Sequence, residues 1–249
     1  MTLVRHHRVH DLDVLTLASP ANRNALSVAL LAELLDRVAA SAERDARGLV
    51  LDHIGPAFCS GVDIKERMAL GPADQTHSAL LGKLLRRLWA YPGPVLCRVD
   101  GAVRGGGMGL VAAADIVVAS AASTFAYREV RVGVAPALVA AVAMAKVAVG
   151  PLLPWLLTGE TFDAATAQRL GLVTRVGEGA TTLDPEYAAL GRCAPGAVAA
   201  VKRLARSGPD LDAVLVAMEA ESAKLFAGPE AQEGLAAFAA GRQPAWVVA

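Results

Sequence analysis

Cysteine, aromatic side chains and net charge are all scarce in this chain of 249 residues. The three cysteines are widely spaced and odd in number, which argues against a disulfide framework or a zinc site. Lysine plus arginine (24) equals aspartate plus glutamate (24), so the charge balance predicts neither a nucleic-acid partner nor an anionic membrane partner. A reducing compartment, the cytoplasm, is the simplest expectation.

Long apolar runs are also missing. The stretch 132–145 is too short to span a membrane and contains Pro136, and Lys146 ends it. Residues 1–13 carry charges at Arg5 and Arg8 and no apolar signal core, so we expect no secretory signal. The 54% hydrophobic content still predicts a well-buried core, in one large domain or one domain with an appendage.

Strand and helix signals alternate over the first 130 residues. Short apolar runs predict strands at 8–10, 14–17, 48–53, 95–99, 116–119 and 125–126. Ser27 is a good N-cap for a helix with an apolar face at 30–38, and leucines at 80–88 predict a second amphipathic helix. Two strands per helix favour a ββα coil over an open nucleotide-binding sheet.

The second half of the sequence is mostly helical. Asp163 is predicted to cap a helix that ends at Leu170, and 173–176 is predicted to be a brief strand. Glycine and proline separate four further predicted helices, at 185–193, 197–207, 211–226 and 229–240. We place a soft boundary near Gly191, which divides the chain into a core of residues 1–190 and a helical region of residues 191–249.

Two glycine-containing loops stand where predicted strands end. One is Phe58–Asp63 and the other is the run Gly105–Gly109. Glycine lets backbone N–H groups approach a ligand closely, and a helix N-terminus adds unpaired N–H groups. The N–H groups of Val62 and Gly106 could therefore point at one oxygen that becomes negative during a reaction, as in an oxyanion hole. A dinucleotide loop fits less well, because G-x-G-x-x-G would need glycine at Leu110.

Few other residues suggest chemistry. Cys59 and Ser60 have no neighbouring base, and the five histidines show no metal-ligand spacing. Glu129 precedes an apolar stretch, and burial would raise its pKa so that it could exchange protons near neutrality. The alternative is a surface ion pair of Glu129 with Arg128 or Arg131. Lys65 and Lys202 are candidates for a phosphate contact, with solvated lysine as the alternative.

Several segments, in order, resemble the enoyl-CoA hydratase/isomerase (crotonase) superfamily. Residues 57–66 (AFCSGVDIKE) and 99–107 (VDGAVRGGG) with 114–116 (ADI) are similar to its two signatures. Residues 20–26 (PANRNAL) resemble its early substrate-side loop, and 157–160 (LTGE) with 167–176 (AQRLGLVTRV) resemble the segment before its helical tail. Residues 230–246 (EAQEGLAAFAAGRQPAW) resemble its ending.

This resemblance implies an α/β fold with a ββα spiral core and a C-terminal helical region for trimerisation or as a lid. It implies acyl-CoA thioester substrates, a homotrimer or dimer of trimers, and no metal or redox cofactor. The amides that match Val62 and Gly106 would polarise the thioester carbonyl, and Glu129 would be the acid/base. Substrate contacts are expected from Ser60, Gly61, Asp63, Ile64, Lys65, Gly105 and Pro136.

One departure concerns the carboxylates. Typical hydratases of the family carry two glutamates, and here Gly109 stands at the position of the first while Glu129 matches the second. A second departure, at 134–138, is expected to reshape the acyl pocket.

The leading hypothesis is hydration of a 2-enoyl-CoA, and the alternative is Δ3,Δ2-enoyl-CoA isomerisation, which needs only one carboxylate. A non-catalytic acyl-CoA-binding protein is the alternative from another class, and hydrolase, dehalogenase or decarboxylase chemistry stays open because the family reuses the same oxyanion hole.

Overall fold

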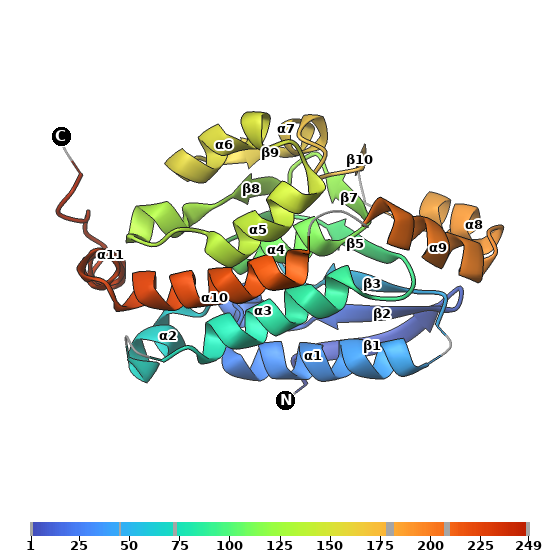
Figure 1. Cartoon of the computed structure of the whole chain (residues 1–249), viewed down its shortest axis with the longest axis horizontal. Coiled ribbons are helices and arrows are strands. Elements are labelled where there is room, and N and C mark those ends of the chain that lie inside the picture. Colours follow the sequence, from blue (N-terminus) through green and yellow to red (C-terminus); the bar gives the residue numbers. More distant parts are fainter. Residues whose placement is uncertain (1, 45, 72–73, 178–181, 207–209, 248–249) are drawn as a thin grey trace.

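Two sheets form the centre of the fold in the computed structural model, which describes residues 2–44, 46–71, 74–177, 182–206 and 210–247 (Figure 1). The larger sheet contains, in spatial order, β1 (Val4–Val9), β2 (Leu12–Leu17), β3 (Gly48–His53), β5 (Val95–Val99), β7 (Ile116–Ser120) and β10 (Arg175–Gly177). The smaller sheet contains β4 (Ala57–Cys59), β6 (Ala102–Arg104), β8 (Thr124–Ala126) and β9 (Phe162–Asp163). Only β1–β2 and β8–β9 pair antiparallel in these sheets.

The chain enters the two sheets alternately. β3, β5 and β7 each join the larger sheet, and β4, β6 and β8 follow them into the smaller one. The connecting helices are α2 (Ile64–Leu70) and α3 (Thr76–Trp89) after β4, and α4 (Gly106–Ala113) after β6. This repeat confirms the predicted ββα spiral. It also places the carboxyl ends of β4 and β6, which are paired parallel neighbours, side by side.

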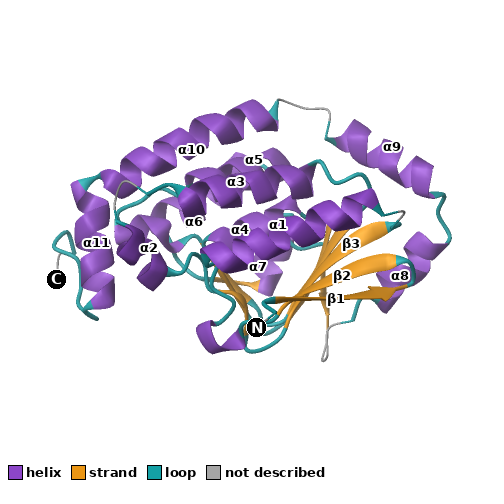
Figure 2. Ribbon diagram, turned by 90° about the horizontal axis from the view of Figure 1, so that it is seen from below, coloured by secondary structure: helices purple, strands orange, loops and turns teal. Residues whose placement is uncertain are grey.

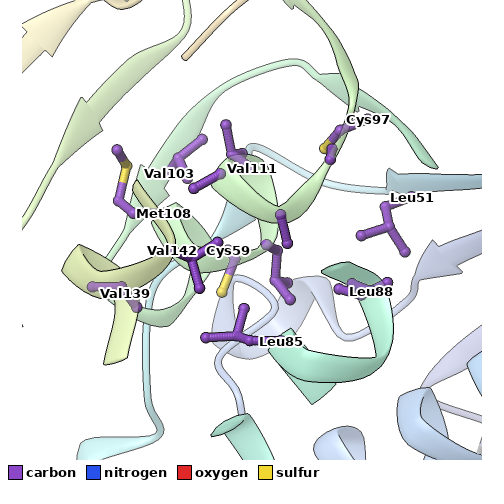
Figure 3. Close-up of a cluster of buried hydrophobic side chains, with 14 of the residues drawn as sticks. Leu51, Cys59, Leu85, Leu88, Cys97, Val103, Met108, Val111, Val139 and Val142 are labelled. Carbon is purple, nitrogen blue, oxygen red and sulfur yellow. The ribbon is translucent and has the colours of Figure 1, made fainter. Parts of the chain in front are cut away.

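Alternate residues of the central strands enter two separate cores, as the two-residue period of a strand requires. One face of the larger sheet packs under α1 (Val28–Glu43), α3 and α4, with Leu49, Leu51 and Cys97 in the main cluster. The opposite face buries Val50 and Leu96 against residues at and before α8 (Asp184–Gly191). Figure 3 shows part of the main cluster, where Cys59, Met108 and Val111 lie among leucine and valine side chains.

A layer of helices covers the sheets on the side of the main cluster (Figure 2). α10 (Leu211–Ala227) lies along α3 and α5 (Ala137–Lys146), and α11 (Pro229–Ala239) packs on the 3-10 helix η2 (Arg128–Val132). The remaining helices are α6 (Val149–Thr158), α7 (Ala164–Arg169), α9 (Pro195–Ala205) and the 3-10 helix η1 (Pro20–Asn22). No helix in the described ranges is both long and apolar enough to cross a membrane.

Most element predictions hold, with shifted ends. Ser27 caps α1 by accepting from the amide of Leu30, and Asp163 caps α7 by accepting from that of Thr166. The predicted strand 8–10 is wrong in its bounds, because β1 spans Val4–Val9 and His10 lies in the turn with a φ of 49°. β10 also begins later than predicted, and helix 197–207 ends at Ala205. Ser207 lies outside the described residues.

Candidate active site

The two glycine loops meet at the carboxyl ends of β4 and β6. Gly61 has a φ of 96° and Gly105 a φ of 49°, a region that side chains disfavour. A β-carbon on Gly105 would lie 3.3 Å from the Gly61 Cα atom, so the two backbones are already in contact. Glycine is required here both for the backbone conformation and for the close approach.

The amides of Val62 and Gly106 have no acceptor within the described part of the chain. Leu26 donates to the Gly61 carbonyl at 2.7 Å and accepts from the Asp63 amide at 3.4 Å, in a parallel bridge opposite Val62. In such a bridge the N–H of the middle residue, Val62, points away from the partner strand. Gly106 is the first residue of α4, where an amide has no partner within the helix.

Close packing holds the start of α4 in place. A β-carbon on Gly106 would lie 2.5 Å from Leu26 Cδ1, and one on Gly107 would lie 2.7 Å from Cys59 Cβ. Cys59 is fully buried, and burial raises the pKa of its thiol to about 12. The prediction that Cys59 is a packing residue and not a nucleophile is confirmed in its burial.

Both amides border a cavity of about 480 Å³. Apolar side chains from several helices form most of its wall: Leu81 of α3, Leu138 and Val139 of α5, Phe226 of α10, and Leu235 and Phe238 of α11. Val134, Ala135, Pro136 and Ala137 also line it, so the divergent segment 134–138 does shape the pocket. The C-terminal helices α10 and α11 thus complete a cavity whose two candidate amides come from the spiral core.

Glu129 supplies a carboxyl group to this cavity. Its Oε2 atom is buried without a hydrogen-bond partner in the described structure, and burial raises its pKa to about 7. The predicted alternative of a surface ion pair is wrong. Arg131 pairs instead with Glu160, and Arg128 donates to the Thr161 hydroxyl at 3.1 Å.

Gly109 lies outside the cavity, on the buried side of α4. A β-carbon there would lie 3.0 Å from both Leu85 Cδ2 and Val139 Cγ1, and these are apolar neighbours. Any side chain at position 109 would therefore require Leu85 and Val139 to shift by a few tenths of an ångström. Within the described residues that line the cavity, Glu129 is the only carboxylic acid.

The predicted substrate-contact residues divide into two groups. Five of them line the cavity, namely Ser60, Gly61, Ile64, Gly105 and Pro136. Asp63 and Lys65 do not: Asp63 caps α2 by accepting from the Glu66 amide at 3.2 Å, and Lys65 is exposed on α2. Both interpretations of Lys202, a phosphate contact and a solvated surface lysine, are wrong, because Lys202 is buried and pairs with Asp115 at 2.8 Å.

Sequence reasoning missed a polar cluster in the cavity wall. His77 and Ser78 of α3, Arg67 of α2 and Ser222 of α10 all line the cavity and are buried. His77 Nε2 lies 2.9 Å from Glu66 Oε2, a carboxylate 11 residues earlier in the chain. A pair of residues 11 apart leaves no recognisable spacing in the sequence. The leucine period of α3 is a signal that could have placed His77 one turn before Leu81, on the same face of the helix. No group of histidine, cysteine, aspartate or glutamate suited to a metal ion is found among the described residues.

Comparisons with known proteins agree on one family. The family model described as enoyl-CoA hydratase/isomerase matches residues 9–248. The 2,3-dehydroadipyl-CoA hydratase of Escherichia coli is 32% identical over 93% of this chain and 93% of its own length. The mitochondrial enoyl-CoA hydratase domain-containing protein 3 of Rattus norvegicus is 32% identical over 93% of this chain and 80% of its own. The crystal structure of an enoyl-CoA hydratase from Mycobacterium avium superposes with a TM-score of 0.83 at 36% identity, covering 99% of this chain and 100% of that one.

Proposed function

The chain belongs to the enoyl-CoA hydratase/isomerase family and is an enzyme of that family, and from this we propose that it hydrates 2-enoyl-CoA thioesters. The observation that carries the proposal is the buried carboxyl group of Glu129, which shares one cavity with two unbonded backbone amides. The enzyme names of the relatives favour an enzyme over the alternative of a non-catalytic acyl-CoA-binding protein, which Gly109 still supports. The name of the Escherichia coli relative supports a CoA thioester as the substrate class.

In the proposed mechanism the amides of Val62 and Gly106 bind the thioester oxygen. Addition at C3 of the enoyl group shifts an electron pair through C2 to this oxygen, which becomes an enolate. The two amides need no reorganisation, because the glycine loops and the packing of Leu26 hold them in place. By comparison with other oxyanion holes, each donor contributes about 3 kcal/mol to stabilisation of the transition state.

Glu129 carries out both proton transfers in this scheme. As a carboxylate it takes a proton from water, and the resulting hydroxide oxygen bonds to C3. As a carboxylic acid it then returns the proton to C2 when the enolate collapses, which gives syn addition of one water. A pKa of about 7 makes both forms accessible near neutrality, as an acid/base that changes roles requires.

Isomerisation of a 3-enoyl-CoA is the second candidate, and the packing at Gly109 favours it. Position 109 has no carboxylate, and even a β-carbon there would press on Leu85 and Val139, so among the described lining residues only Glu129 is available for proton transfer. Isomerisation needs one base, which removes a proton from C2 and returns it to C4. The same oxyanion hole would hold the dienolate formed between these two steps.

The remaining features of the proposal follow from family membership. We expect a homotrimer or dimer of trimers, with no metal or redox cofactor; the cytoplasmic location is proposed separately, from the unpaired cysteines. The helices α10 and α11 within residues 191–249 contribute Phe226 and Leu235 to the cavity, which supports a lid role for this region. Ser60, Gly61 and Ile64 are proposed to contact the thioester end of the substrate, where they line the cavity.

Product analysis by mass spectrometry tests the proposal. The protein is given 2-enoyl-CoA and 3-enoyl-CoA substrates of several chain lengths in deuterated water, beside the Glu129→Gln variant. A water adduct that is lost in the variant supports hydration. Bond migration without an adduct supports isomerisation instead, and absence of both across the panel overturns both functions.

A further inference from the structure

His77 lines the substrate cavity and has a ring nitrogen that makes no hydrogen bond in the described structure. Its side chain is only 2% exposed and lines the cavity, and its Nδ1 atom is buried with no partner in the described structure. The other ring nitrogen, Nε2, lies 2.9 Å from Glu66 Oε2. The proposed mechanism uses neither nitrogen. A buried polar atom without a partner destabilises a protein, which suggests that a ligand completes it.

The partner of Nε2 determines what Nδ1 can bind. An ionised carboxylate only accepts hydrogen bonds, so Nε2 carries the proton that it donates to Glu66. In the neutral form of the ring this leaves a lone pair on Nδ1, which accepts from an O–H or N–H group. Glu66 Oε2 also accepts from the Val28 amide at 2.8 Å, and this second contact holds the carboxylate in position behind the ring.

Two serines beside His77 provide the complementary donor. Ser78 Oγ and Ser222 Oγ lie 3.3 Å apart, and both residues line the cavity. One hydroxyl uses its hydrogen in this contact, and the other hydroxyl retains a hydrogen that can be donated elsewhere. The cluster of His77, Ser78 and Ser222 therefore offers both an acceptor and a donor to a bound molecule.

The polar cluster is displaced from the oxyanion hole along the direction of α3, which passes both. Leu81 Cδ2 would lie 3.3 Å from a β-carbon on Gly106, so Leu81 contacts the hole. His77 precedes Leu81 by one turn of α3, which is about 6 Å along the axis. Helices α2, α3, α10 and α11 gather at this end of the molecule (Figure 1), and Phe226 and Leu235 from α10 and α11 add apolar wall to the cavity there.

We propose that the enzyme takes acyl-CoA substrates whose acyl chain carries a hydroxyl group several carbons beyond the thioester. The hydroxyl donates to His77 Nδ1 and accepts from the Ser78–Ser222 pair, while the carbons before it pass the apolar wall. This inference rests on the proposed function, because it assumes a thioester carbonyl at the Val62 and Gly106 amides. It adds a substrate class that the oxyanion hole and Glu129 do not specify.

The charges around the cluster favour a hydroxyl over a carboxylate. Glu66 already places a negative charge behind His77, and a second carboxylate in front of the ring would be repelled. Arg67 is the nearby cation of the cavity wall, but it donates to the Gly71 carbonyl at 2.6 Å and lies 4.6 Å from the centre of the Phe226 ring. Asp74 also interacts with the charge of Arg67.

Binding of saturated thioesters tests the inference without requiring turnover. Hexanoyl-CoA is compared with 4-, 5- and 6-hydroxyhexanoyl-CoA by titration calorimetry on the full chain. We expect at least one hydroxylated isomer to bind roughly five- to tenfold more tightly than hexanoyl-CoA, the size of one or two net hydrogen bonds. The His77→Phe variant is expected to lose this preference.

The matched control is His53→Gln. His53 is another buried histidine with an unpartnered Nδ1, but it accepts from the Asp100 amide and does not line the cavity. This control should keep the wild-type preference. Should His77→Phe fail to fold, ¹⁵N NMR of the wild-type histidines replaces it, and the His77 Nδ1 signal should move with a hydroxylated isomer and not with hexanoyl-CoA.

Two results overturn the inference: wild-type protein that prefers none of the hydroxylated isomers, or a preference that survives in His77→Phe. The proposed function fails separately, when hexanoyl-CoA binds but no enoyl-CoA is converted, and the hydroxyl preference can still be measured in that case. If no CoA thioester binds at all, both proposals are wrong.

Discussion

Glu129 Oε1 lies 3.4 Å from the point that a β-carbon on Gly105 would occupy. The acid/base candidate therefore stands directly against the glycine loop that presents the Gly106 amide. The same contact helps to shield the carboxyl group from water, and burial is the main cause of its raised pKa. In the proposed mechanism, one short loop therefore positions both an amide that polarises the substrate and the carboxyl group that transfers the proton.

The raised pKa of Glu129 predicts a stability difference that depends on pH. A carboxyl with a folded-state pKa of about 7 and an ordinary value of 4.5 favours folding when protonated, and this contribution is lost as the pH rises through 7. We expect Glu129→Gln to be more stable than wild type by up to about 3 kcal/mol at pH 8, with little difference near pH 4.5. Urea unfolding of both proteins at the two pH values measures this difference in unfolding free energy. A difference of equal size at pH 4.5 and pH 8 would contradict the burial of this charge.

Replacement of Gly105 by alanine should damage both the loop and the activity. Alanine at a φ of 49° is strained, and its β-carbon would lie 3.3 Å from the Gly61 Cα atom. We expect a loss of roughly 1–3 kcal/mol in unfolding free energy and at least a tenfold loss in kcat/KM. The control is Gly150→Ala in α6, where a β-carbon meets nothing within 4 Å. Gly150→Ala should keep its activity and gain up to about 1 kcal/mol of unfolding free energy. Equal stability and equal kcat/KM in the two variants would refute the role of Gly105.

A glutamate introduced at position 109 should not produce a second catalytic carboxylate. Leu85 and Val139 each lie 3.0 Å from the β-carbon position, and the charge would have no partner there. Gly109→Glu is expected to lose about 3 kcal/mol or more of unfolding free energy, whereas Gly109→Ala should lose about 1 kcal/mol. Thermal unfolding and turnover measure both effects. A stable Gly109→Glu variant with higher hydratase activity would show that the pocket extends to this position.

The three cysteines should differ sharply in reactivity. Cys59 and Cys97 are fully buried, and burial raises the pKa of the Cys59 thiol to about 12, whereas Cys193 is exposed. A thiol reagent should therefore modify one cysteine in the native protein and three after unfolding. Peptide mass spectrometry identifies the modified residue, and rapid native labelling of Cys59 would mean that the packing of the loop before Gly61 is open.

The sequence predicts central strands best, and edge elements least well. The apolar runs 48–53 and 95–99 match β3 and β5 at both ends, because Gly48 begins the first run, Pro94 precedes the second, and both strands are largely buried. The prediction for β1 is too short, since the four residues between Val4 and Val9 in this edge strand are arginine or histidine and show no apolar alternation. Its pairing with β2 extends to Val4, which is a tertiary effect with no local signal.

Site prediction follows the same division. Val62, Gly106 and Glu129 are identifiable because each belongs to a local pattern, either a glycine loop or a carboxylate beside an apolar segment. His77 is not, because its role depends on Glu66, its partner 11 residues away, and on Ser222, which joins the same cavity wall only when α10 packs on α3. Lys202 is misread for the same reason, as its partner Asp115 comes from a distant turn.

The pH dependence of kcat/KM for wild type beside Glu129→Gln tests the central claim most directly. With the carboxylate as the base, wild-type kcat/KM on the best 2-enoyl-CoA should rise tenfold per pH unit at low pH and level off above an apparent pKa near 7. Glu129→Gln should lose at least about a hundredfold of the plateau activity while still binding the substrate. A variant that keeps wild-type activity, or a wild-type profile that is flat from pH 5 to 8, would contradict Glu129 as the single acid/base.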